Sequence, residues 1–287
     1  MIALVLEGGA NRTYYTIGIL DAMLENNIEV DILIGVSAGI ANGISYISKQ
    51  KGRSLELGMR YIKDKRYMGF RHYFKKNNRS YYNIDFVFKE IPRKLVPFDY
   101  ETFQNFKGDV YAVVTNLETG KPEYLKIDDY EKSWQIILAS CSLPFMFKPV
   151  EIGDEKYMDG GCSDPLPVKF AESLGADKLI TVLTREKGYK KEKDSESKFS
   201  SFFFRKNKNF ANVLKNRSAI YNDSKEYLYK KEKDGSAFVF APKCTKNWKR
   251  TEKNTDILMK MYREGYNDAI NRMNELKKFI AKDDDNR

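Results

Sequence analysis

A single serine between two glycines, directly after an apolar run, constrains the fold of this chain more than any other feature. Residues 30–34 have the composition of a buried strand, Ser37 follows, and Gly35 and Gly39 lie two residues to either side of it. In so tight a turn, a Cβ at either glycine would collide with the opposite arm. We therefore predict a strand-to-helix turn. It would present the Ser37 hydroxyl over a helix N-terminus, whose dipole favours developing negative charge.

Strands and helices are predicted to alternate along the first part of the chain. Residues 2–6 form a continuous apolar run, as in parallel strands that are buried on both faces, and a glycine-rich turn and a helix to about residue 26 follow. The strand at 30–34 and a helix to about residue 49 repeat this order. The pattern predicts an α/β fold of three layers (α/β/α), with helices on both faces of a mostly parallel central sheet.

The rest of the chain extends this pattern without a clear domain boundary or an internal repeat. We predict helices inserted over one edge of the sheet within 52–97, and a helix from about 166 to 174. We also predict strands at 111–115, 123–127, near 150 and 157, at 178–184 and at 237–240, and helices at 130–140, up to 231, and from 255 to 280. Segment 186–208 has no period and is predicted to be a mobile loop. The expected organisation is a single domain over 1–287, with its core motifs in 1–185 and the C-terminal helices packed on the body.

Charge and composition narrow the expected partners and location. Basic residues outnumber acidic ones by 50 to 40, giving a formal charge of +10, which favours anionic partners but also fits a lysine-rich solvated surface. Basic and aromatic residues are dense in 60–82, which suits a lipid surface, a nucleic acid, or a helical cap with buried aromatics. Three cysteines without metal spacing and no membrane-length apolar run predict a cytoplasmic protein with at most peripheral membrane contact.

A serine nucleophile requires a base, and the chain offers few candidates. Its one histidine, His72, lies within the basic and aromatic stretch. In α/β-hydrolases the histidine comes last of the three catalytic residues, so His72 does not suit this role. Asp159 precedes Gly160 and Gly161 after a short predicted strand, where glycines would let the backbone approach the nucleophile closely. An Asp-Gly-Gly sequence is also a common turn, so the motif alone does not decide the matter.

Taken together and in order, these motifs resemble the patatin-like phospholipases. The resemblance rests on the glycine-rich turn Gly8-Gly9-Ala10, on Gly35-Val36-Ser37-Ala38-Gly39 and on Asp159-Gly160-Gly161. The flanking stretches 115–120, 139–144 and 157–167 are similar to bacterial members as well. The resemblance covers about residues 1–185 and implies a patatin-like fold and a lipid acyl hydrolase with a Ser-Asp dyad and no catalytic histidine.

The resemblance also implies roles for individual residues. Ser37 would be the nucleophile and Asp159 its base, and the backbone amides of Gly8, Gly9 and Ala10 would form the oxyanion hole. Arg12 matches a basic position of the family, which would hold the turn or face a phosphate; a charge at a helix start explains it equally well. The chain has Ala10 and Thr13 where the family has glycines. Alanine at that position is expected to donate its N–H only if its φ is negative.

The expected function is hydrolysis of a carboxylic ester of a lipid, as by a phospholipase A or a lysophospholipase, through an acyl-Ser37 intermediate. No cofactor and no metal ion are expected. The expected partners are the lipid ester and an anionic membrane surface, but not nucleic acid. The alternatives are a non-catalytic lipid- or protein-binding module on a degenerate hydrolase scaffold, an acyltransferase or transacylase, and an esterase that depends on His72.

Overall fold

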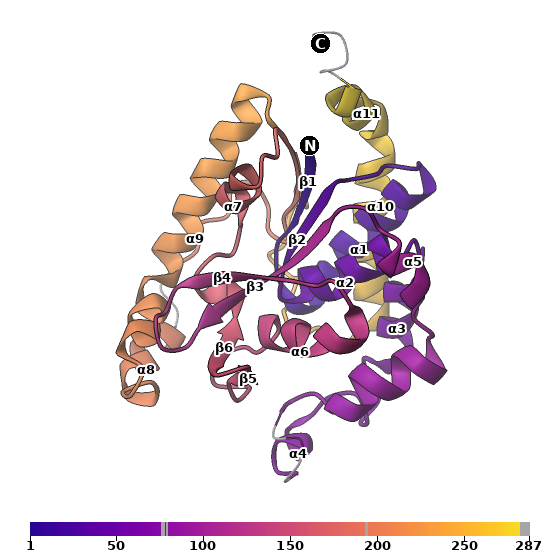
Figure 1. The fold of residues 1–287 in the computed structure, drawn as a ribbon. Coiled ribbons are helices and arrows are strands. Elements are labelled where there is room, and N and C mark those ends of the chain that lie inside the picture. Colours follow the sequence, from indigo (N-terminus) through magenta and orange to yellow (C-terminus); the bar gives the residue numbers. More distant parts are fainter. Residues whose placement is uncertain (76–77, 79, 193–194, 282–287) are drawn as a thin grey trace.

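The structure, a computed structural model, describes residues 1–75, 78, 80–192 and 195–281 (Figure 1). Within these residues eight strands form a central sheet, in which pairing links the strands in the order β5-β6-β3-β2-β1-β7-β8. The remaining strand, β4, also pairs with β3. The strands are β1 (Ile2–Leu6), β2 (Ile32–Val36), β3 (Asp109–Asn116), β4 (Pro122–Lys126), β5 (Val150–Ile152), β6 (Glu155–Asp159), β7 (Lys178–Val182) and β8 (Ala237–Phe240).

The sheet is mostly parallel, as predicted. Strands β3, β2, β1, β7 and β8 run in one direction. Strands β4 and β6 pair antiparallel with β3, and β5 pairs antiparallel with β6. The carboxyl ends of the parallel strands therefore meet at one edge of the sheet, where ligands bind in open α/β sheets.

Helices cover both faces of the sheet and complete the three predicted layers (Figure 1). One face carries α1 (Tyr14–Glu25), α2 (Ala38–Ile47), α6 (Tyr130–Ser140), α10 (Thr255–Asn271) and α11 (Met273–Ala281), and the other α7 (Val168–Ser173) and α9 (Lys208–Asp234). Alternate residues of β1 separate the two cores. Leu4 and Leu6 pack with α1 and α2, whereas Ala3 and Val5 pack with α7 and α9. This alternation is the period-2 side-chain pattern of a strand that is buried on both faces.

The insertion between α2 and β3, which includes the basic and aromatic stretch 60–82, forms a helical cap beyond α2, at the lower right of Figure 1. It contains α3 (Arg53–Tyr61), α4 (Phe70–Tyr73) and the π-helix η2 (Phe86–Leu95), and α5 (Tyr100–Gln104) leads back to the sheet. Arg53 ties the cap to α2, because its guanidinium donates to the Ser45 hydroxyl and to the carbonyls of Val96 and Pro97. Of the aromatics of the stretch, Tyr61 is buried and packs against Phe86 of η2, whereas Phe70 and Phe74 are exposed, so the helical-cap interpretation describes only part of the stretch.

Two predicted segments differ from the structure. Segment 186–208 contains a helix, α8 (Ser195–Phe203), where we predicted a loop. The final helix is broken at Arg272 into α10 and α11, although its apolar stripe continues across the break. Arg272 lies over the ring of Phe238 and donates to the Val239 carbonyl, so contact with β8 accompanies the end of α10.

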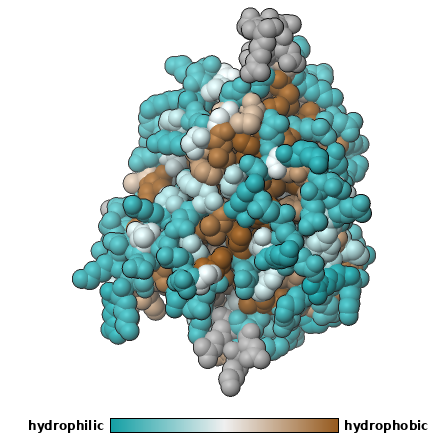
Figure 2. All heavy atoms as spheres, viewed as in Figure 1, coloured by the Kyte–Doolittle hydropathy of each residue, from teal (hydrophilic) through white to brown (hydrophobic). Residues whose placement is uncertain are grey.

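Hydrophilic residues cover most of the molecular face seen in Figure 2, and hydrophobic residues appear mainly along its middle. This agrees with the basic, highly charged composition of the chain. Of the helices that the structure describes, none is both long enough and apolar enough to cross a bilayer.

Candidate active site

Strand register brings Ser37 and Asp159 together. β4 occupies one side of β3, from Tyr111 to Thr115, so β2 and β6 must share the other side. There β2 ends with Val36 opposite Val113, and the antiparallel strand β6 ends with Asp159 opposite Val114. The last residue of β2 and the last residue of β6 therefore occupy consecutive positions along β3. Ser37, which follows β2 directly, emerges beside Asp159.

Ser37 has the strained backbone that the predicted turn requires. Its φ is 53° and its ψ is −127°, outside the regions where residues with a side chain ordinarily lie. A Cβ on Gly35 would come within 2.5 Å of the Ile40 backbone in the opposite arm, as predicted. A Cβ on Gly39 would instead come within 2.5 Å of the Leu6 carbonyl. Glycine at this position therefore allows the close approach of β1, and not that of the opposite arm of its own turn.

The Ser37 hydroxyl is not used in holding the turn. Serine is a preferred N-cap residue, yet Ser37 makes no capping bond to α2. The turn is held through its backbone, because the Ser37 N–H donates to the buried Ser140 hydroxyl at 2.9 Å. The hydroxyl lies beside the Asp159 carboxyl and the Cys141 thiol. Burial, with the neighbouring Asp159 charge, raises the pKa of the Cys141 thiol, so the thiol stays protonated and does not compete as a nucleophile.

Asp159 is buried and only partly satisfied. Its Oδ1 accepts the Gly161 N–H at 2.8 Å, whereas its Oδ2 is buried and accepts no hydrogen bond of normal geometry from the described residues. Burial raises the pKa of the carboxyl, and the charge of Arg217, the Ser37 hydroxyl and the Gly161 amide act in the opposite direction. Glycine at position 160 allows Asp159 to lie this close to β3, because a Cβ on residue 160 would come within 2.2 Å of the Val113 carbonyl. The free oxygen is suited to accept a proton.

The turn after β1 approaches Ser37 closely. A Cβ on Gly8 would lie 3.0 Å from the Ser37 Cβ, and a Cβ on Gly9 would lie 2.6 Å from the Thr184 hydroxyl. Across the described part of the chain, no hydrogen bond engages the backbone amides of Gly8, Gly9 or Ala10. The amides of Gly8 and Gly9 are therefore available to an oxygen atom near Ser37.

The two departures from the family pattern have structural consequences. Ala10 has a φ of 48°, in the left-handed region where only glycine avoids strain, so the condition of a negative φ is not met. Thr13 is buried, and its hydroxyl donates to the Ala10 carbonyl and accepts from the Asn42 side chain of α2. Thr13 thus ties the strained turn to the helix that follows Ser37, a link that glycine would not provide.

A pocket rich in positive charge, which we name the cationic pocket, opens on one side of Ser37. Its floor includes Glu7, Gly8 and Gly9, with Asp159 and Gly161 at the serine. Its basic residues come from four separate parts of the chain: Arg12 of η1 (Ala10–Thr13), Arg185 and Lys191 after β7, Arg217 of α9 and Arg250 before α10. Of the two interpretations of Arg12, a place facing a bound anion agrees with this geometry, since Arg12 is buried and lines the pocket.

A second pocket, which we name the apolar pocket, is lined both by residues next to the serine turn and by the helical cap. Ala10, Ala38 and Cys141 are among its lining residues. Apolar and aromatic side chains make up most of its wall: Tyr14, Ile17, Ala41, Ile44, Leu57, Ile62, Tyr67, Met68, Tyr82, Val87, Phe88, Tyr130 and Ile137. Its one charged residue is Arg53, which the cap and α2 already engage in hydrogen bonds.

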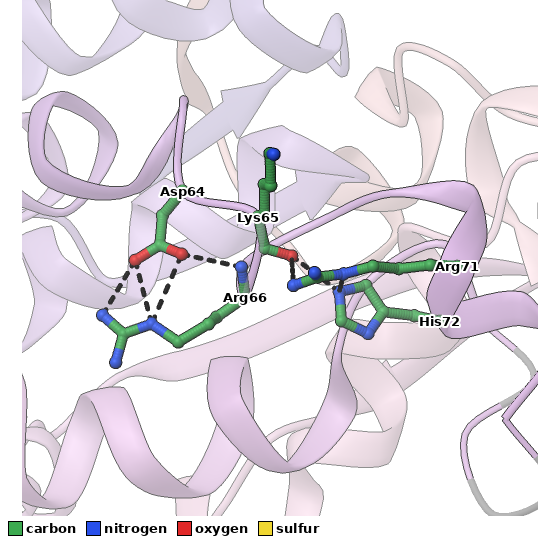
Figure 3. A network of polar contacts seen from close by, with 5 residues as sticks. All are labelled: Asp64, Lys65, Arg66, Arg71 and His72. Atoms are coloured by element: carbon green, nitrogen blue, oxygen red, sulfur yellow. Dashed lines mark hydrogen bonds and ion pairs between the residues drawn. The ribbon is translucent and has the colours of Figure 1, made fainter.

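His72 belongs to a different part of the molecule. It is fully buried, and its Nε2 lies 2.9 Å from the Lys65 carbonyl, beside Arg71 in the network of Figure 3. It lines neither the cationic nor the apolar pocket. Its surroundings are those of a residue that holds α4 against the preceding loop.

Several residues of the site were not predicted from the sequence. Ser140 and Cys141 lie in a stretch that resembled the family, but the sequence assigned them no role. Arg185 follows a predicted core strand, and this placement could have indicated a site at the carboxyl edge of the sheet. Arg217 and Arg250 carry no sequence signal, because only the fold brings them to the serine. Among the residues that the structure describes, no group of three or more His, Cys, Asp or Glu side chains is placed to hold a metal ion.

Comparison with known families gives two matches. The family described as patatin-like phospholipase matches residues 4–172, which include Ser37 and Asp159. A domain of unknown function (DUF6363) matches residues 207–281. The second region is not separate in the structure: it contains β8, which pairs with β7, and Arg217, whose guanidinium donates to the Gly161 carbonyl at 3.1 Å.

The individual relatives have low sequence identity to this chain and are longer than it. The uncharacterized protein YjjU of Escherichia coli (strain K12) is 28% identical over 197 residues, covering 64% of this chain and 52% of YjjU. Lysophospholipase nte1 of Aspergillus terreus is 26% identical over 190 residues, covering 63% of this chain and 12% of that protein. The chain thus spans about half of one relative and a small part of the other. Among solved structures, VipD from Legionella pneumophila matches with a TM-score of 0.40 and 13% identity, covering 91% of this chain and 66% of VipD.

Proposed function

Because this chain belongs to the patatin-like phospholipase family, we propose that it is a lipid acyl hydrolase that cleaves carboxylic esters through an acyl-Ser37 intermediate. The observation that carries the proposal is the pairing of a strained, uncapped Ser37 with a buried carboxylate, Asp159, whose Oδ2 accepts no other hydrogen bond from the residues that the structure describes. The name of the relative nte1, a lysophospholipase, supports a lysophospholipid or phospholipid as substrate.

In the proposed reaction, the Ser37 Oγ attacks the ester carbonyl carbon while its proton passes to the Asp159 Oδ2. A serine hydroxyl is a far weaker acid than a carboxylic acid, so the proton moves only as the C–O bond forms. The amides of Gly8 and Gly9 would bind the oxyanion, and each such donor is worth about 10²–10³-fold in kcat. The leaving alkoxide takes the proton from Asp159 as its bond to carbon breaks.

Deacylation repeats these steps with water. Asp159 accepts a proton from the water as the water oxygen attacks the acyl carbon. Asp159 then returns this proton to the Ser37 Oγ as the fatty acid leaves. Another alcohol in place of water would make the enzyme a transacylase, since the acyl-enzyme is the same species. The apolar pocket suits the acyl chain because its wall is mostly hydrophobic and it reaches the serine turn at Ala38 and Cys141.

We also propose that the protein is cytoplasmic and contacts an anionic membrane peripherally. Exposed phenylalanines lie on α4 and α8, at the lower end of Figure 1 toward which β1 runs from the N-terminus. They are Phe70, Phe74, Phe199, Phe202 and Phe203, with exposed Arg71, Lys75, Arg205 and Lys206 nearby in sequence. Aromatics at the interface with basic residues at the headgroups favour anionic lipid. Binding to anionic liposomes should weaken with salt and with Phe202→Ser, and equal binding to neutral liposomes would contradict the electrostatic part.

Labelling with a fluorophosphonate probe tests the proposed chemistry directly. Wild-type protein should be labelled at Ser37, Ser37→Ala should not be labelled, and Asp159→Asn should lose most labelling while remaining folded. The labelling rate should fall as the pH falls through the pKa of Asp159, which burial raises, because the base must be deprotonated. His72→Ala is the control for the histidine-dependent esterase and should keep its labelling. A folded wild-type protein without labelling would favour the non-catalytic binding module.

A further inference from the structure

We propose that the cationic pocket binds a phosphate group of the lipid substrate, so that the enzyme prefers esters with a net-negative phosphate headgroup over choline or uncharged headgroups. The inference rests on the proposed function, because the phosphate is taken to belong to the lipid whose ester Ser37 attacks. The apolar pocket, which Ala38 of the serine turn lines, then receives the acyl chain.

The balance of charge in the pocket favours an anion. Five basic side chains line it (Arg12, Arg185, Lys191, Arg217 and Arg250), against three acidic ones (Glu7, Asp159 and Glu192). Two of the acids have other partners: Glu7 accepts the Thr184 N–H, and Asp159 lies beside Ser37. Basic residues that converge from four parts of the chain would repel one another in a buried space, and an anion would relieve that repulsion.

Two arginines present donors without partners. Arg12 is only 8% exposed, and its Nε makes no hydrogen bond within the described residues. The Nε of Arg250 is also buried without a partner there. Burial, then the nearby charges of Arg185 and Arg250, lower the pKa of Arg12 to about 10, although Glu7 acts in the opposite direction. Arg12 is still cationic at neutral pH. A buried donor left unpaired is costly, so these N–H groups point to a ligand that accepts hydrogen bonds.

The chemistry of the donors favours phosphate. Planar guanidinium groups match the oxygens of phosphate with pairs of parallel hydrogen bonds. A choline headgroup would instead need free aromatic faces for its quaternary ammonium. The rings at this pocket already have cations of the chain itself: Arg185 lies 4.5 Å from the ring centre of Tyr189, and Lys191 lies 5.6 Å from that of Tyr221. Lys225 lies near both rings as well.

Three lipids with one acyl chain in common test the proposal: lysophosphatidic acid, lysophosphatidylcholine and monoacylglycerol, each in micelles of a neutral detergent. Wild-type kcat/KM should be about tenfold or more higher for lysophosphatidic acid than for the other two. In Arg250→Gln this preference should fall about tenfold, mainly through KM, and Arg250→Lys should restore part of it. The backbone bond from the Asn11 N–H to the Arg250 carbonyl survives both changes. Arg263→Gln, at an exposed position on α10, removes the same charge outside the pocket and should keep the preference.

The outcomes separate this inference from the proposed function. Turnover of all three lipids at similar kcat/KM, or an equal loss in Arg250→Gln and Arg263→Gln, would overturn the headgroup assignment while leaving the hydrolase intact. Inorganic phosphate that binds tightly to Ser37→Ala, without any preference for lysophosphatidic acid in the wild type, would assign the pocket to free phosphate and overturn the headgroup assignment too. Absence of both turnover and fluorophosphonate labelling in folded protein would instead contradict the proposed function itself.

Discussion

The two pockets beside the serine turn differ in both chemistry and origin. The apolar pocket is built by α1, α2 and α6 and by the helical cap inserted between β2 and β3. The cationic pocket is built by the carboxyl ends of β1 and β7, by α9 and by the segment before α10. The comparison teaches that the proposed selection of the acyl chain and the proposed selection of the headgroup would change independently, because each would depend on a different insertion or extension around one serine turn.

The largest effect is expected from a change to the turn itself, which serves both pockets. In Gly35→Ala the new Cβ would lie 2.5 Å from the Ile40 backbone, so the turn must shift and Ser37 with it. Turnover of every ester should fall about 100-fold or more, and the protein should lose about 2 kcal/mol of stability, as in overpacked cores. Kinetics on short and long esters and thermal unfolding would measure this.

Gly188→Ala is the matched control for this change. No heavy atom lies within 4 Å of a Cβ built at Gly188, and its φ is not positive, so activity and stability should stay near the wild type. A Gly35→Ala variant that lost activity only toward long-chain or only toward phosphate esters would show that the turn belongs to one pocket and not to both.

An intermediate effect is expected from filling the apolar pocket. Ala41 lies on α2 and lines this pocket, so Ala41→Leu places a larger side chain in the proposed path of the acyl chain. Excluding two or three methylenes should lower kcat/KM about tenfold or more for long-chain p-nitrophenyl esters and much less for the butyrate, at about 0.8 kcal/mol per methylene. The headgroup preference should stay unchanged. A uniform loss over all chain lengths would place the acyl chain elsewhere.

The smallest effect is expected at Ala10, which lines the apolar pocket and follows Gly8 and Gly9 of the proposed oxyanion site. Its φ of 48° costs about 1–2 kcal/mol for alanine, and glycine regains that strain but loses about 0.4–1 kcal/mol through the entropy of the unfolded chain. Ala10→Gly should therefore stabilise the protein by about 1.6 kcal/mol at most, and the labelling rate should change by less than about threefold. Thermal unfolding and probe kinetics would check this.

Lys49→Gly is a control for the backbone effect, because exposed Lys49 has a similar φ of 53° and is not among the lining residues of either pocket. Its stability should rise similarly and its labelling should not change. If Ala10→Gly increased labelling many-fold while Lys49→Gly did not, the departure from the family's glycine would be a functional restraint on the oxyanion site.

The parts of the site that the sequence predicted are those whose signals lie within a few consecutive residues. The strand-and-glycine pattern around Ser37 predicted the turn, because steric exclusion of a Cβ at Gly35 acts within a few residues. Absence of a well-placed histidine directed attention to Asp159, which the structure places beside Ser37. The sequence did not predict the helix in 186–208, where the local periodicity is weak. It also did not predict the break at Arg272, which is accompanied by tertiary contact with β8.

By itself the sequence determined the α/β order of elements, the serine turn and the Asp-Gly-Gly motif, since these depend on periodicity and on backbone sterics over short range. The tertiary structure alone decided three things. Strand register placed Asp159 next to the end of β2. A left-handed backbone at Ala10 showed that alanine is strained where the family has glycine. Folding of distant segments gathered Arg185, Arg217 and Arg250 around Arg12. Charges separated by up to some 240 residues meet only when the sheet closes, and no local pattern records that encounter.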